Sequence, residues 1–213
     1  MTNAKDEKRE RGNTLTHLLG AVFALSCIWM VWPAVRLGWQ WAFGTIFFIS
    51  GMFLMFLSST LYHWVRPGRV KTVLRKLDHI NIYVMIACSY TPICVAVVGG
   101  ALGWTVFGLL WATVLAGTFY KIFALGRWPR LSLALYLLMG WSGLFVARPV
   151  VQALSWRPLS LILLEGVLYT AGTWFFARDH KRHYHAIWHL FVLGGAMAHW
   201  AAILLIILEQ TGI

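Results

Sequence analysis

Charged residues are scarce in this chain, and acidic residues are the scarcest of them. Only 12% of the 213 residues are charged, and 7 Asp and Glu stand against 18 Lys and Arg. Apolar residues make up 60% of the sequence and the mean hydropathy is +0.70, which excludes an ordinary soluble domain. Because a transmembrane helix needs about 20 apolar residues, the length accommodates about seven spans and no separate soluble domain.

The sequence also lacks an even number of cysteines and any regular alternation of polar and apolar residues. The three cysteines, Cys27, Cys88 and Cys94, are odd in number and lie in apolar stretches, which argues against a disulfide framework. Runs such as residues 51–57 do not alternate between polar and apolar, which argues against β-barrel strands. Residues 1–14 are charged and the first apolar run is long enough to span, so we expect no cleavable signal peptide.

We therefore predict an all-α integral membrane protein, built as a bundle of seven transmembrane helices. The ends of the spans are placed where charge, Gly or Pro interrupts the apolar runs. The expected spans are residues 15–35, 39–64, 78–98, 102–123, 131–148, 158–177 and 185–208. The seven-helix domain thus covers residues 15–208, between a cytoplasmic N-terminal segment, 1–14, and a short outer C-terminal tail, 209–213.

Basic residues are distributed unequally between the two sides of the expected bundle. Lys and Arg concentrate in the short loops on the cytoplasmic side of membrane proteins. The N-terminal segment and the second, fourth and sixth loops hold 15 of them, and the opposite side holds 3. We therefore expect the N-terminus in the cytoplasm and the C-terminus outside. Topology and contact with anionic lipid account for the net positive charge, so no nucleic-acid partner is expected.

Several ionisable residues meet at the cytoplasmic ends of the expected spans. Such residues are costly in a bilayer and are kept mostly where they pair, bind a ligand or carry protons. His63 ends the second span, Asp78 opens the third, and His185 and His189 open the seventh. His17 and His79 start spans at the same face. His185 and His189 are four residues apart, so they project from one face of a helix.

This arrangement predicts a zinc site formed by His63, His185 and His189. Zinc accepts neutral imidazole nitrogen, and catalytic zinc commonly has three protein ligands and one open position. Asp78 would then take a proton from the metal-activated water, although it could also be the N-cap of the third span. Ser59, one turn before His63, would stabilise a developing oxyanion, or would bond a carbonyl of its own helix.

A longer pattern of motifs runs through most of the chain. It comprises Glu10-x-x-Asn13-x-x-Thr16-His17, Ser58-Ser59-Thr60-Leu61-Tyr62-His63, Leu77-Asp78-His79 with Ser89-Tyr90-Thr91-Pro92, Leu138-Met139-Gly140-Trp141, and His185-Ala186-Ile187-Trp188-His189 with His199. The pattern resembles the haemolysin III family, the bacterial branch of the progestin and adipoQ receptor family. The resemblance implies a multi-pass protein of the bacterial inner (plasma) membrane, with zinc at the three histidines, Asp78 near the metal water and Ser59 as the motif serine.

The resemblance also implies an activity. The wider superfamily includes alkaline ceramidases, so a zinc-dependent, ceramidase-like hydrolase of a lipid amide or ester is expected, with membrane lipids as partners and a part in membrane lipid homeostasis. One alternative is a receptor-like or regulatory membrane protein in which the zinc is structural. Another is a haemolysin-like pore or ion pathway that uses His17, His79, His199 and Glu165. The apolar run at residues 190–198 argues against a polar relay along the last span.

Glu165 departs from the family pattern, because small or apolar residues are usual at this place in the sixth span. It lies about 10 Å below the expected outer face at 1.5 Å per residue. His199 lies about 21 Å along the seventh span from His185 on the same scale, also in the outer half. We predict that Glu165 and His199 pair across adjacent helices, away from the zinc.

Overall fold

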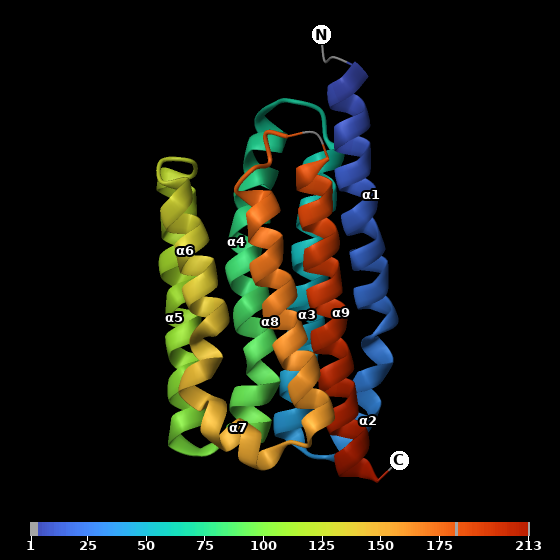
Figure 1. Cartoon of the computed structure of the whole chain (residues 1–213), viewed down its shortest axis with the longest axis vertical. Coiled ribbons are helices and arrows are strands. Elements are labelled where there is room, and N and C mark those ends of the chain that lie inside the picture. The colour runs from blue at the N-terminus through green and yellow to red at the C-terminus, as the bar shows by residue number, and fades with distance from the viewer. Residues whose placement is uncertain (1–3, 182, 213) are drawn as a thin grey trace.

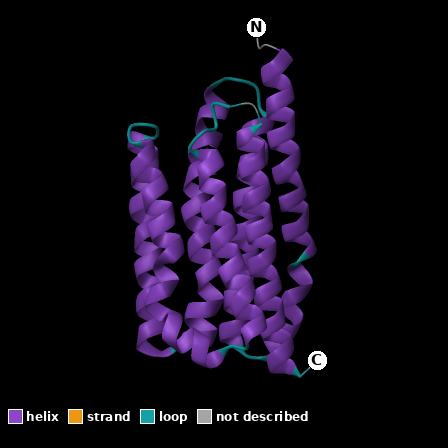
Figure 2. Cartoon of the chain, viewed as in Figure 1, coloured by secondary structure: helices purple, strands orange, loops and turns teal. Residues whose placement is uncertain are grey.

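Long helices form almost the whole of the computed structural model, which describes residues 4–181 and 183–212. Arg182, one of the basic residues of the expected sixth loop, lies outside the described residues. Seven helical spans are long and apolar enough to cross a membrane, and no strand occurs in the described ranges (Figure 2). The predicted fold class is therefore confirmed. The spans are Lys8–Arg36, Trp39–Trp64, Arg69–Val98, Gly100–Ala124, Pro129–Ala153, Trp156–Phe176 and Tyr184–Thr211.

Four of these spans correspond to single helices, and three are built from consecutive helical pieces. The single helices are α3 (Trp39–Trp64), α5 (Gly100–Ala124), α8 (Trp156–Phe176) and α9 (Tyr184–Thr211). The first span contains α1 (Ala4–Ser26) from Lys8 onward, η1 (Ile28–Met30) and α2 (Val31–Arg36). The third contains α4 (Arg69–Pro92) and the π-helical turn η2 (Ile93–Val98), and the fifth contains α6 (Pro129–Gly140), η3 (Trp141–Val146) and α7 (Ala147–Ala153).

The irregular turn in the third span follows directly from Pro92. Proline lacks the amide hydrogen that an α-helix uses, and its ring clashes with the carbonyl four residues earlier. The helix therefore widens into η2 immediately after this residue. Gly99, whose φ is +60°, ends η2 and starts the turn into α5.

Two helices begin earlier than the hydropathy pattern predicts. α1 starts at Ala4, so residues 4–14 of the expected N-terminal segment are helical and His17 lies in mid-helix rather than in the first turn. α4 starts at Arg69, so the alternative assignment of Asp78 as an N-cap is wrong. The physical reason is that Arg and Lys end an apolar run without ending a helix, because they are good helix formers with long side chains.

The N-terminus and the loop residues 65–68, 125–128 and 177–181 lie at one end of the bundle, and the C-terminus lies at the other (Figure 1). The loops that were expected to be rich in positive charge therefore share the end that carries the N-terminus, here called the N-terminal end. Lys121, counted among those loop residues, is instead buried near the end of α5, where its Nζ donates to Ser132 Oγ at 2.7 Å.

The closest helix packing occurs between α3 and α4 and between α8 and α9. A side chain at Gly51 of α3 would collide with Cys88 of α4, so the small residue permits the two helices to approach. Between α8 and α9, a Cβ at Gly195 would lie 2.6 Å from the Tyr169 ring. Within α8 only Pro158 and Gly172 are fully buried, and the other residues are partly buried or exposed.

Candidate metal centre

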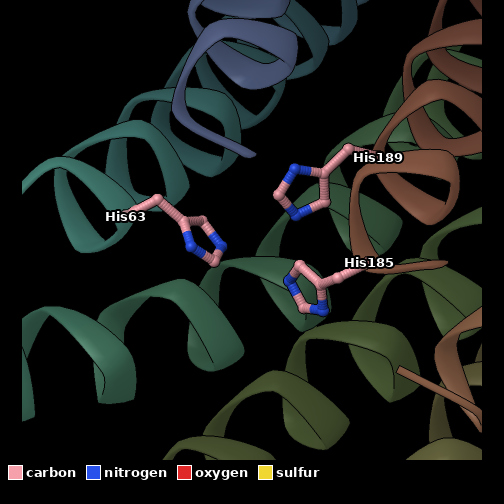
Figure 3. A group of neighbouring side chains, drawn as sticks. All are labelled: His63, His185 and His189. Atoms are coloured by element: carbon pink, nitrogen blue, oxygen red, sulfur yellow. The ribbon is translucent and has the colours of Figure 1, made fainter. Parts of the chain in front are cut away.

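Three imidazoles meet at the N-terminal end of the bundle. His63 comes from the last turn of α3, and His185 and His189 come from the first two turns of α9 (Figure 3). One possible ligand atom from each residue can be chosen so that all three lie within 4.8 Å of one another. The structure therefore brings together the three residues that the sequence proposed as ligands, in a group that could hold a metal ion.

A carboxylate fixes the orientation of His63. Nδ1 of this imidazole lies 2.6 Å from Oε2 of Glu10, and Oε1 of Glu10 accepts a hydrogen bond from Lys71 Nζ at 3.0 Å. An ionised carboxylate only accepts hydrogen bonds, so the imidazole hydrogen stands on Nδ1 and a lone pair on Nε2. Nε2 is buried and has no partner in the described structure, as expected of an atom that is free to bind a metal.

The main chain and a hydroxyl group of α1 fix His189 in a similar way. Its Nδ1 lies 3.2 Å from the carbonyl oxygen of Asn13 and 3.0 Å from Thr16 Oγ1. The carbonyl can only accept, so Nδ1 of His189 also carries the hydrogen. The imidazole of His17 stacks on the ring of His189, with the two centroids 3.5 Å apart. Metal-binding histidines commonly donate their second N–H to such oxygen acceptors, which orient the ring and raise its basicity.

His185 faces the loop between α8 and α9. Its Nδ1 lies 3.7 Å from Asp179 Oδ2, and the imidazole lowers the pKa of the Asp179 carboxyl. The main chain of Asp179 is held from α1, because Arg9 donates a hydrogen bond to its carbonyl oxygen at 2.5 Å. Each of the three imidazoles therefore has an oxygen atom opposite its Nδ1.

A small polar cavity of about 280 Å³ adjoins the histidines. It is lined by Arg9, Glu10, Asn13, Tyr62, His63, Asp179 and His185. Sites for whole drug-sized ligands usually measure about 300 to 1,000 Å³. The cavity therefore suits the polar part of a lipid-sized molecule, and the apolar part would have to lie elsewhere.

The two residues predicted to act on a substrate have different surroundings. Ser59 is buried on α3, and its hydroxyl has no hydrogen-bond partner among the described residues. Asp78 is half-buried on α4, does not line the cavity, and makes no hydrogen bond or ion pair in the described part of the chain. Its role stays a prediction.

The interpretation of the sequence did not assign Glu10 and Asn13 to the site. Both residues lie in the segment that we expected to precede the first span, because the charges around them interrupt the apolar run. The missed signal is the spacing of Glu10, Asn13, Thr16 and His17, which places them on one face of a helix. That face of α1 supplies oxygen partners to two of the three imidazoles.

Comparisons with known proteins agree with this architecture. The model of the family described as "Haemolysin-III related" matches residues 5–200. The chain belongs to the haemolysin III family. It is 38% identical over 200 residues to the Hemolysin-3 homolog of Bacillus subtilis, covering 92% of this chain and 93% of the relative. It is 35% identical over 204 residues to Hemolysin-3 of Bacillus cereus, covering 94% and 93%.

A plant relative extends the similarity to the wider receptor family. The chain is 29% identical over 188 residues to the Heptahelical transmembrane protein ADIPOR2 of rice, Oryza sativa subsp. japonica, covering 74% of this chain and 79% of the relative. Together with the seven spans, these matches identify a multi-pass membrane protein, consistent with the bacterial inner membrane.

Proposed function

We propose that this haemolysin III protein is a zinc-dependent hydrolase of a lipid amide or ester. The observation that carries the proposal is the group of three histidines, in which His63 has a buried, unpaired Nε2 and oxygen partners face the Nδ1 atoms. This donor set fits zinc, which prefers neutral imidazole nitrogen. The bound ion would supply Lewis acidity, which polarises a carbonyl group and acidifies a water molecule.

The residues around the histidines would keep this site in one geometry. Glu10 holds His63, and the main chain of Asn13 with the hydroxyl of Thr16 holds His189. Because these partners fix which imidazole nitrogen carries hydrogen, the other nitrogen is prepared to bind a cation without rearrangement. The polar cavity would receive the headgroup of a substrate, and its acyl chain would stay in the bilayer.

Two further residues would act on the substrate itself. The unpaired hydroxyl of Ser59 is available to donate a hydrogen bond to an oxyanion that develops at the scissile carbonyl. Asp78 would accept the proton that the attacking water loses. If the N-terminal end faces the cytoplasm, as the charge distribution predicts, the chemistry would take place at the inner leaflet.

The number of ligands favours this function over a purely structural zinc in a receptor-like protein. Structural zinc sites usually have four protein ligands, and catalytic sites have three. Within the described residues the histidine group has three members. A fourth protein ligand would favour the receptor-like alternative.

Zinc content and hydrolysis, measured on the same samples, test the proposal. Purified wild-type protein is compared by elemental analysis with His63→Ala and His189→Ala, and His180→Ala in the exposed loop is the matched control. We expect about one zinc per wild-type and control chain, and loss of both zinc and ceramide or ester hydrolysis in the other two variants. Zinc without turnover of any lipid amide or ester would support the structural alternative. Absence of zinc from folded wild-type protein would refute the site.

The Asp78→Asn variant tests the assigned proton acceptor separately. We expect it to retain zinc and to lose hydrolysis, because the substitution removes a base without touching the histidines. Loss of zinc from folded Asp78→Asn would instead make Asp78 a ligand or a structural partner.

A further inference from the structure

Carboxylate groups face three imidazoles in the described structure. Oε2 of Glu165 on α8 lies 2.6 Å from Nδ1 of His199 on α9, which confirms the pairing predicted from the sequence. His199 lies about 21 Å along α9 from His185 at 1.5 Å per residue, so this contact does not belong to the histidine group. The other two carboxylates face candidate metal ligands, and one of them, that of Asp179, is not part of a helix.

The carboxylate opposite His185 lies in the loop between two helices. Asp179 belongs to the segment that joins α8 to α9 and to neither helix. Oδ2 of Asp179 lies 3.7 Å from Nδ1 of His185, which exceeds hydrogen-bond distance, whereas Oε2 of Glu10 lies 2.6 Å from Nδ1 of His63. Of the three imidazoles of the group, His185 therefore has the least firmly fixed partner.

Arg9 of α1 contacts the main chain of this loop. Its Nη2 atom donates a hydrogen bond to the carbonyl oxygen of Asp179 at 2.5 Å. Among the described residues this is the one hydrogen bond between α1 and the loop, and the guanidinium forms no ion pair there. Both residues line the polar cavity, together with His185. The position of Asp179 beside the histidine group therefore depends on α1.

α1 also reaches the other two imidazoles. It contacts His63 through Glu10, and His189 through Asn13 and Thr16. Positions 9, 13 and 16 lie on one side of a helix, because they are separated by four and three residues. A single helix therefore contacts every part of the histidine group, and its contact with the loop serves the third imidazole.

An outer carboxylate has a defined effect on a metal-binding histidine. It accepts the hydrogen of one ring nitrogen, fixes the orientation of the ring and raises the basicity of the other nitrogen. Opposite His185, the carboxylate faces Nδ1 and leaves the lone pair of Nε2 for the ion. Holding a loop residue in one conformation costs entropy, and a hydrogen bond from a neighbouring helix offsets that cost.

We propose that Arg9 and Asp179 are positioning residues for His185. Arg9 holds the loop against α1, and the Asp179 carboxylate then orients the imidazole toward the ion. The inference rests on the metal site of the proposed function, and it adds two residues on which the affinity for the ion depends. Because Arg9 acts through the carboxylate, removal of Arg9 should matter only while the carboxylate of Asp179 is present.

A double-mutant cycle on zinc affinity tests this dependence. The protein in lipid nanodiscs competes for zinc with a chelator of known affinity, and thermal midpoints of the metal-free proteins show which variants are folded. We expect Asp179→Ala to bind zinc about 10- to 100-fold more weakly than wild type, and Arg9→Ala about three- to tenfold more weakly. The double variant should match Asp179→Ala within about twofold. Lys8→Ala removes an exposed positive charge next to Arg9 and should bind zinc as the wild type does.

Two results of the cycle would overturn the proposal. If removal of Arg9 weakens zinc binding by the same factor with and without the Asp179 side chain, Arg9 supports the fold in general and does not act through the carboxylate. If folded Arg9→Ala and Asp179→Ala both bind zinc within about twofold of wild type, neither residue positions His185. Arg9→Lys is a second variant at this position, which keeps a positively charged donor and should bind zinc more tightly than Arg9→Ala.

The absorption spectrum of bound cobalt gives an independent readout. Co²⁺ can replace zinc, and its visible absorption bands depend on the arrangement of the ligands. We expect the bands to change in Arg9→Ala and in Asp179→Ala and to stay unchanged in Lys8→Ala. Unchanged bands in the first two variants would contradict a role in orienting a ligand.

Neither measurement needs turnover, so this proposal and the proposed hydrolase can fail separately. Wild-type protein that binds zinc and hydrolyses a lipid, with variants of unchanged zinc affinity, would refute the positioning role alone. Weakened zinc binding in the expected pattern, in a protein that hydrolyses no lipid amide or ester, would support the positioning role and refute the hydrolase.

Discussion

The contact between Glu10 and His63 permits a graded test of how the metal centre is held. Oε2 of Glu10 lies 2.6 Å from Nδ1 of the imidazole, and Glu10 itself is held by Lys71 at 3.0 Å. Removal of a partner that orients a metal-binding histidine typically costs a factor of about 10 to 100 in metal affinity. Two substitutions at this position separate the loss of charge from the loss of the acceptor.

Glu10→Gln keeps an oxygen that can accept from Nδ1 and removes the negative charge. We therefore expect zinc affinity to fall about tenfold, which corresponds to about 1.4 kcal/mol. Glu10→Ala removes the acceptor as well and leaves the ring of His63 without its partner. Here we expect a loss nearer 100-fold, or about 2.7 kcal/mol.

The assay is a competition titration, in which a chelator of known affinity and the purified protein share zinc at fixed pH. Glu209→Gln is the matched control, because it removes one acid from the opposite end of the bundle and should bind zinc as the wild type does. The thermal stability of the metal-free variants shows whether they are folded. If folded Glu10→Gln and Glu10→Ala both bind zinc within twofold of wild type, Glu10 does not position His63, and the interpretation of this contact is wrong.

Three further substitutions, one of them with a matched control, test the surroundings of the site and the packing of the helices. Ser59→Ala should retain zinc and lower the rate of hydrolysis by about 100-fold, as expected for loss of one oxyanion donor; an unchanged rate would exclude that role. Thr16→Val should weaken zinc binding by less than tenfold, because the Asn13 carbonyl still accepts from His189; a larger loss in the same chelator titration would give the hydroxyl the main part. Gly51→Val should destabilise the bundle by about 1 to 3 kcal/mol through its clash with α4, whereas Gly108→Val, with open space around it, should change the thermal midpoint little.

The fold could be predicted from the sequence because only helix bundles and closed β-barrels can cross a bilayer. Seven apolar runs of spanning length leave a helix bundle as the simple solution, and the structure has seven spans at corresponding places. The helix ends were harder to predict, as α4 shows. Its first turns contain Arg69, Lys71 and Arg75, which end the apolar run, yet the backbone is helical from Arg69 onward. Hydropathy reports where side chains meet lipid, and helical hydrogen bonding extends beyond that boundary.

The histidines of the site could be predicted because they lie at the ends of apolar spans, where helical spacing and the direction of each span bring them together. His185 and His189 follow from a four-residue interval, and His63 joins them because the even and odd spans run in opposite directions. Glu10 could not be placed by the same reasoning, since hydropathy gave no sign that α1 extends past the charged residues and packs against α3. Asp78 was predicted to act at the site because it lies at the same end of the bundle in sequence terms. The position along a helix does not determine the direction in which a side chain points, and Asp78 does not line the cavity.

The spacing of polar residues along α9 bears on the pore alternative. His189 and His199 are separated by about 15 Å at 1.5 Å per residue, and the residues between them are apolar or glycine. In the middle of that interval the Tyr169 ring packs against Gly195, and the Tyr169 hydroxyl has no hydrogen-bond partner in the described structure. No hydrogen-bonded chain of described residues therefore joins the contact between Glu165 and His199 to the metal centre. Two separate polar sites, the histidine group that could hold a metal and the contact between Glu165 and His199, account for these residues better than a continuous pathway does.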